Sequence, residues 1–172
     1  MITTRSLLAL AGMAAICGGL ARIFAAFPLL TDPADREWLY TVIDILLLFG
    51  LLGVYLDRAG RLGFLGLGSF GVGVAALSFI GGPDADPFGF STYEQGATVL
   101  AIAMVGLSLA WLRAGERPIW APLCWFASVL AAGVLGRLPA PAPDYALTAA
   151  GVLFGAGFVC AGLPLINARG GR

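Results

Sequence analysis

The chain contains no histidine and no lysine, and it carries little charge of either sign. Without histidine, the commonest metal ligand and the commonest proton shuttle are both missing, which excludes histidine-dependent catalysis, haem ligation and most zinc sites. All ten basic residues are arginine, so no lysine is present as a nucleophile or base. The formal net charge is zero, so no basic field exists to attract nucleic acid.

Cysteine is scarce, and its placement indicates no chemistry. Cys17, Cys124 and Cys160 stand singly in three apolar runs, without CxxC spacing, and we expect them to behave as small buried hydrophobic residues. No carboxylates are paired at catalytic spacing, and the GLGSFG segment lies inside an apolar run with no strand before it. We therefore expect no enzyme, no cofactor and no metal site.

Charged residues make up 12% of the chain and hydrophobic residues 59%, with a mean hydropathy of +0.92. Soluble globular proteins carry about 25% charged residues. A chain with so little charge cannot cover its own core with a water-compatible surface, so it requires lipid as its solvent. Its length predicts one domain, residues 1–172.

Apolar runs of about 20 residues, the length that crosses a hydrocarbon core of ~30 Å, occur six times. They cover approximately residues 6–27, 38–57, 62–81, 95–113, 118–137 and 145–166. Segments rich in glycine, proline or charge separate them. The sequence thus predicts an all-α fold, a polytopic transmembrane bundle of six helices.

The arginine distribution predicts the orientation, because short cytoplasmic loops hold an excess of basic residues. Most arginines fall on one side of the predicted topology: Arg5, Arg58, Arg61, Arg113, Arg117, Arg169 and Arg172. Both termini are therefore predicted to be cytoplasmic, with Asp32, Asp35, Asp84, Asp86 and Asp144 outside. The first run is also similar to a signal peptide, but we favour a retained span because it continues to Phe27.

One carboxylate, Asp44, interrupts the apolar segment YTVIDILLLFGLL at residues 40–52. It lies roughly 10 Å below the outer end of its span, where burying a charge is unfavourable. Glu37, Tyr40 and Thr41 precede it at helical spacing, so we expect one polar stripe. Arg22 is the arginine that lies inside an apolar run away from a cytoplasmic end, at nearly the same depth.

Two interpretations of Arg22 and Asp44 compete, since intramembrane ionisable residues indicate function by default. In the first, which we favour, a buried ion pair fixes the register of two helices. In the second, the two residues line an outward-opening pocket for a polar or charged solute. Two further alternatives are a protonated, hydrogen-bonded Asp44 and an Arg22 that extends to the lipid headgroups.

Other polar residues reach a similar outer level: Ser78, Glu94, Gln95, Thr98, Arg137, Tyr145 and Thr148. We attribute them to helix ends rather than to a vestibule. The four tryptophans are expected near the membrane interfaces as anchors. Small residues predict close helix packing, within one chain or between copies, and the glycine-rich third run is expected to be central.

The segments LAGMAAICGG, WLYTVIDILLLFGLLGVYLDRAG and GVLFGAGFVCAGLPL, with the glycine-rich third run between the last two, resemble those of small uncharacterised six-span membrane proteins of GC-rich bacteria. This resemblance implies a six-helix bundle in a bacterial inner membrane, with no activity to transfer. We expect a non-enzymatic membrane component that packs against a partner or itself through small-residue faces. The alternative is a small permease or channel around Asp44 and Arg22, whose case is strengthened if the faint two-helix repeat (RAG at 58–60 and 113–115) is real rather than a chance recurrence.

Overall fold

The computed structural model describes residues 3–80 and 91–167, which excludes Asp84, Asp86, Arg169 and Arg172 of the predicted loops. Within these residues the fold is all-helical, as predicted. The elements are α1 (Thr4–Ala25), α2 (Pro33–Ile80), α3 (Thr92–Arg113), α4 (Trp120–Leu130), the π-helix η1 (Ala131–Leu135) and α5 (Ala142–Asn167). Helices α1, α2, α3 and α5 are long and apolar enough to cross a membrane.

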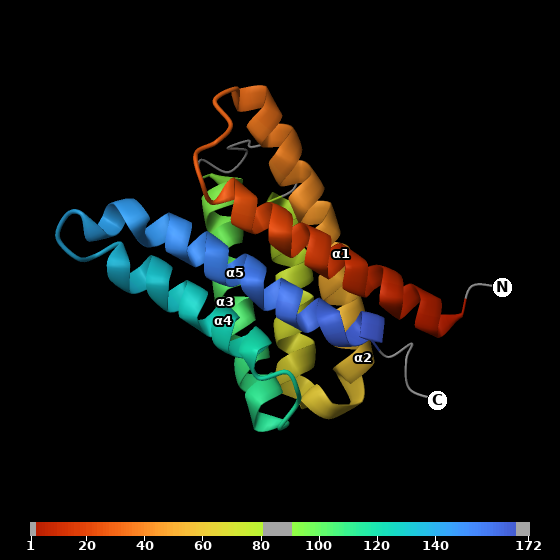
Figure 1. The fold of residues 1–172 in the computed structure, drawn as a ribbon. Coiled ribbons are helices and arrows are strands. Elements are labelled where there is room, and N and C mark those ends of the chain that lie inside the picture. Colours follow the sequence, from red (N-terminus) through yellow and green to blue (C-terminus); the bar gives the residue numbers. More distant parts are fainter. Residues whose placement is uncertain (1–2, 81–90, 168–172) are drawn as a thin grey trace.

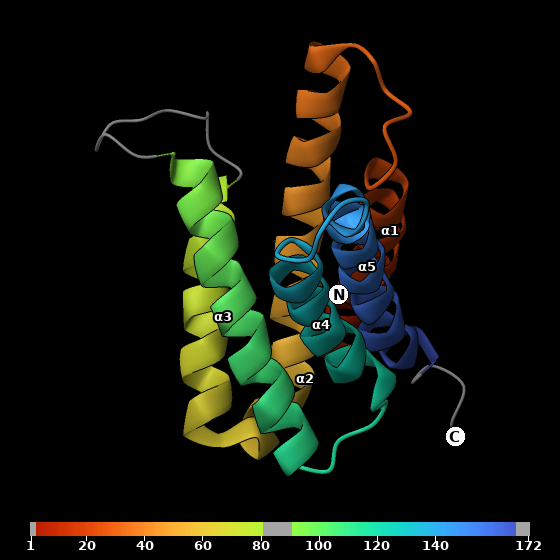
Figure 2. The ribbon, with the colours of Figure 1, turned by 90° about the vertical axis from the view of Figure 1, so that its left-hand side faces the viewer.

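The prediction of six separate helices is wrong in number, because the described residues form five α-helices, and η1 continues the fourth. The predicted spans 38–57 and 62–81 both fall in α2. Its 48 residues leave the helical conformation at Gly63, where φ is 63° and ψ is −164°. Glycine adopts a positive φ without steric cost, and the chain reverses direction there (Figures 1 and 2).

The predicted span 118–137 is shorter than expected. It corresponds to the 11 residues of α4 and the five of η1. Pro118 precedes the helix, and the residue before a proline is disfavoured in the α conformation. Beyond η1, Gly136 and Pro139 end the helical run.

The helices form a ring in which neighbours along the chain pack together (Figure 2). Helix α1 lies between α5 and the part of α2 before Gly63, and α3 lies between α4 and the part after Gly63. Tyr55 and Phe70 stack across the two parts of α2, with ring centroids 4.0 Å apart. We call one end of the ring, where α2 ends and α3 begins, the Ile80 end. The opposite end, with the α2 reversal and the α3–α4 loop, is the Gly63 end.

Small residues hold α1 against both of its neighbours. A Cβ on Gly19 would meet the carbonyl oxygen of Gly155 in α5, and a Cβ on Gly50 of α2 would meet Ala15. The absence of a side chain therefore lets these backbones approach closely. The predicted small-residue faces of the first and last spans thus pack within the chain.

The glycine-rich third run is not central, contrary to our expectation. It forms the part of α2 after Gly63, where the Phe64 side chain is 88% exposed and a Cβ added to Gly68 or Gly71 would have nothing within 4 Å. Gly66 and Gly73 are buried on the other side, toward α3. Glycines on two faces of one helix cannot all meet neighbours when only one face is covered.

Candidate functional site

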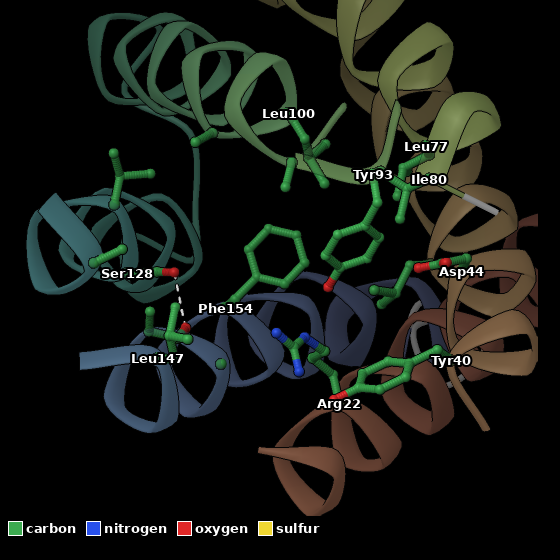
Figure 3. Close-up of a pocket in the computed structure, with 17 residues that line it drawn as sticks. Arg22, Tyr40, Asp44, Leu77, Ile80, Tyr93, Leu100, Ser128, Leu147 and Phe154 are labelled. Atoms are coloured by element: carbon green, nitrogen blue, oxygen red, sulfur yellow. Dashed lines mark hydrogen bonds between the residues drawn. The ribbon is translucent and has the colours of Figure 1, made fainter. Parts of the chain in front are cut away.

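A cavity of about 190 Å³ lies toward the Ile80 end of the ring (Figure 3). Every helix contributes to its wall: α1 through Arg22, α2 through Tyr40, Asp44, Leu77 and Ile80, α3 through Tyr93 and Leu100, α4 through Ser128, η1 through Ala132, and α5 through Leu147, Gly151 and Phe154. A site built from all helices depends on how they pack, and not on any one of them. The π-turn in the wall also bears on function, because such turns occur frequently at functional sites.

Arg22 reaches this cavity from the last turn of α1. Its guanidinium lies 5.8 Å from the centroid of the Tyr40 ring. On its other side is Gly151, where an added Cβ would come within 3.4 Å of the guanidinium carbon. Glycine at this position leaves space for the guanidinium beside α5, and Figure 3 shows it directed toward Phe154.

The predicted ion pair between Arg22 and Asp44 does not form. Neither residue has an ion-pair partner within 4.0 Å among the described residues. Both residues line the cavity instead, and Figure 3 shows their side chains directed into it from different helices. Arg22 and Asp44 do line one cavity, but the expectation of similar depth did not determine how far apart the two side chains stand.

The rest of the predicted stripe divides between two faces of α2. Tyr40 lines the cavity, and its hydroxyl donates to the Ala25 carbonyl at 3.3 Å. Thr41 donates to the Glu37 carbonyl of its own helix at 2.9 Å, and neither residue lines the cavity. With 3.6 residues per turn, Thr41 is rotated away from Asp44 to the opposite side from Tyr40.

The other outer polar residues also stay outside the cavity. Ser78 and Thr98 donate to carbonyls of their own helices, Val74 and Glu94, at 2.9 and 3.0 Å. Thr148 donates to the Ala26 carbonyl at 3.2 Å, where α1 has ended and its last carbonyls lack helical partners. These contacts agree with polar residues collecting at helix ends.

Aromatic side chains fill the ring below the cavity. Phe154 in the cavity wall packs on Phe158, Phe158 on Trp125, and Trp125 on Trp111, with ring centroids 5.2, 5.2 and 5.9 Å apart. Trp111 and Trp125 are fully buried, so the expectation of interfacial anchors is wrong for these two. We call these four residues the aromatic column. Trp38 and Trp120 are exposed, as expected of anchors.

A second charged cluster lies at the Gly63 end, beneath the aromatic column. Arg58 is only 3% exposed, and its guanidinium lies 4.3 Å from the Trp111 ring centroid. It is 2.9 Å from the Asp57 carboxylate and 4.0 Å from that of Glu116, which Arg61 contacts at 3.1 Å. This end of the ring is closed by paired charges.

The sequence did not lead us to expect this cluster, because its arginines served only to orient the chain. Two carboxylates, Asp57 and Glu116, stand among the arginines of the predicted cytoplasmic side. These two acidic residues on an otherwise basic side were the feature of the sequence that could have indicated a charged cluster. They did not reveal that Arg58 donates to the Arg117 carbonyl at 3.4 Å and so ties helix α2 to the α3–α4 loop.

Comparisons with protein-family models, with curated proteins and with solved structures found no match to this chain. Among the described residues, no three metal-binding side chains gather in one place. The arrangement of the side chains is therefore what indicates the function. It offers one cation, one anion, two tyrosines and a serine at the wall of a small cavity whose other lining residues are apolar.

Proposed function

We propose that this protein is a small permease or channel that binds a polar solute in the cavity around Arg22 and Asp44. One observation carries the proposal: two opposite charges share a cavity without pairing. Unpaired charges away from bulk water are unfavourable, so they require water or a solute beside them. A dry structural pair would have placed its two charges in contact.

We further propose six membrane crossings with both termini in the cytoplasm of a bacterium and the cavity facing outward. A straight α2 would measure about 72 Å, more than twice the ~30 Å hydrocarbon core, so its two parts suit two crossings. Arg58 and Arg61 lie beside the Glu116 carboxylate at the Gly63 end, and Arg58 donates to the Arg117 carbonyl there. An arginine-rich end suits the cytoplasmic side of an inner membrane.

Access of water to position 44 tests this proposal. We would replace the native cysteines and introduce cysteine at Ile43, Asp44 or Ile45 in turn. Ile43 is buried in the protein, and Asp44 lies in the cavity wall. Ile45 is 62% exposed on the outer face of the helix. A membrane-impermeant thiol reagent added outside should label position 44 at least about tenfold faster than positions 43 and 45, because only the cavity holds water in this scheme.

A second variant, Ala101→Cys, keeps both charges and probes the cavity wall from α3. It should also label rapidly. Protection of both 44 and 101, at the level of position 43, would contradict a water-accessible cavity. It would favour a protein whose role is packing in the membrane.

A separate observation supports this second candidate function, packing against a partner in the membrane. Gly68, Gly71 and Ala75 lie on the outer side of α2, where the described part of the chain leaves them exposed. Small residues on an open helix face suit contact with another membrane helix, from a copy of this chain or a different partner. Crosslinking through Gly71→Cys in native membranes distinguishes this role, since a solute carrier acting alone gives no crosslinked species.

A further inference from the structure

The cavity presents two charges of opposite sign from neighbouring helices. The Arg22 guanidinium has no hydrogen-bond acceptor among the described side chains and backbone, and Asp44 has no donor. Because both face the same space, an occupant meets a permanent cation on the α1 side and a carboxylate on the α2 side. Water can hydrate both groups in such a space, but only a ligand with charges of its own also neutralises them.

The two charges select among ligand classes. A guanidinium presents a fork of donors that matches a carboxylate, and an aspartate accepts hydrogen bonds from an ammonium group. A purely anionic ligand would satisfy Arg22 while facing repulsion from Asp44, and a purely cationic one would do the reverse. A ligand with both charges satisfies both residues and leaves the site neutral.

The rest of the wall limits the remainder of the ligand. Leu77, Leu100, Leu147 and Phe154 are apolar, and the volume of about 190 Å³ admits only a small molecule. Building on the proposed function, we propose that the solute is a small zwitterion with an aliphatic side chain, of the α-amino acid class. Its carboxylate binds Arg22, its ammonium group binds Asp44, and its side chain lies against the leucines.

Calorimetric titration of the purified full-length protein tests this assignment with three ligands of similar shape. L-leucine carries both charges, 4-methylpentanoate only the carboxylate and 3-methylbutylamine only the ammonium group. Leucine should bind at least about tenfold more tightly than either, since each missing charge removes a charge-assisted hydrogen bond. Glycerophosphoethanolamine, a zwitterionic lipid headgroup, should bind more weakly than leucine because it lacks the aliphatic group.

Variants assign each charge to its residue. Arg22→Gln should reduce leucine affinity to that of the amine, and Asp44→Asn should reduce it to that of the acid. Arg137→Gln and Asp35→Asn are matched controls, exposed and outside the cavity wall, and should bind leucine normally. Size-exclusion chromatography and circular dichroism confirm folding, and Arg22→Lys, which keeps the charge but loses the fork, serves if Arg22→Gln does not fold.

The outcomes separate the two proposals. Equal binding of leucine and 4-methylpentanoate would assign a simple anion site, and preference for the headgroup would assign a lipid site; either overturns the amino acid class. No binding of any compound, with rapid labelling at position 44, overturns the ligand class and leaves the cavity proposal standing. Protection of positions 44 and 101 overturns both.

Discussion

Arg58 and Arg22 lie in the same ring of helices, and each guanidinium lies near an aromatic ring, yet their polar surroundings differ. Arg58 contacts two carboxylates, donates to the Val54 and Arg117 carbonyls and lies over Trp111. Arg22 lies near one tyrosine ring and borders a cavity, without a carboxylate in contact. A guanidinium that the fold itself neutralises holds structure together, whereas one left uncompensated is available for a ligand.

The aromatic column separates these two regions. It begins in the cavity wall at Phe154 and ends at Trp111, whose ring lies 4.3 Å from the Arg58 guanidinium. Packed rings leave no space for water along this path. Inside the ring of helices, the cavity around Arg22 and Asp44 therefore lies toward the Ile80 end, and packed aromatic rings lie between it and the Arg58 cluster.

The largest expected difference is in stability. Arg58→Gln should lower the free energy of unfolding by about 3 kcal/mol, because it removes a buried cation together with its contacts to Asp57 and to the largely buried Glu116. Arg22→Gln should lower it by less than about 1 kcal/mol, since no contact with a carboxylate is lost. Unfolding in mixed micelles with increasing SDS, followed by circular dichroism, measures both. Arg61→Gln, at a side chain 56% exposed, is the control for losing a charge at the surface, and equal losses at 58 and 22 would remove the distinction.

Double-mutant cycles should give a smaller but more specific difference. For Arg58→Gln and Glu116→Gln, the coupling energy should reach about 1 to 2 kcal/mol, as for residues in one charged network. For Arg22→Gln and Asp44→Asn, the two losses should add to within about 0.5 kcal/mol. A coupling at Arg22 and Asp44 as large as that at Arg58 would mean that the pair is in contact in solution.

The smallest expected difference in stability is between substitutions of the two buried tryptophans. Trp111 donates from its indole nitrogen to the Glu116 carbonyl at 3.1 Å and packs against the Arg58 guanidinium. The indole nitrogen of Trp125 is buried without an acceptor in the described structure. Substitution by phenylalanine removes the same volume from each. Trp111→Phe should therefore be more destabilising than Trp125→Phe by about 1 kcal/mol. Thermal unfolding in detergent checks this ordering, and the reverse ordering would show that packing outweighs the hydrogen bond.

Composition and run length were enough to predict the helical fold, because hydrophobicity over about 20 residues follows directly from the order of residues. For the reversal in α2, charge and glycine in DRAGR indicate a loop between the second and third runs. The chain instead stays helical through Arg61 and breaks at Gly63. Which of several nearby glycines adopts the positive φ depends on the packing on either side.

Only the polar residues of the candidate site could be predicted from the sequence. Arg22, Tyr40 and Asp44 stand out because they are polar within apolar runs, and all three line the cavity. Leu100 and Phe154 carry no such signal, since one leucine or phenylalanine in a membrane span is like any other. Their place in the wall follows from the rotation of α3 and α5, which sequence periodicity did not define.

The brevity of α4 and η1 has a consequence for the surrounding bilayer. Together they extend about 24 Å, several ångströms less than the hydrocarbon thickness beside them. Such hydrophobic mismatch is relieved by local thinning of the lipid, at fractions of a kcal/mol per ångström. On that flank, lipids with short acyl chains fit the protein better than long ones, so membrane thickness acts directly on the η1 wall of the cavity.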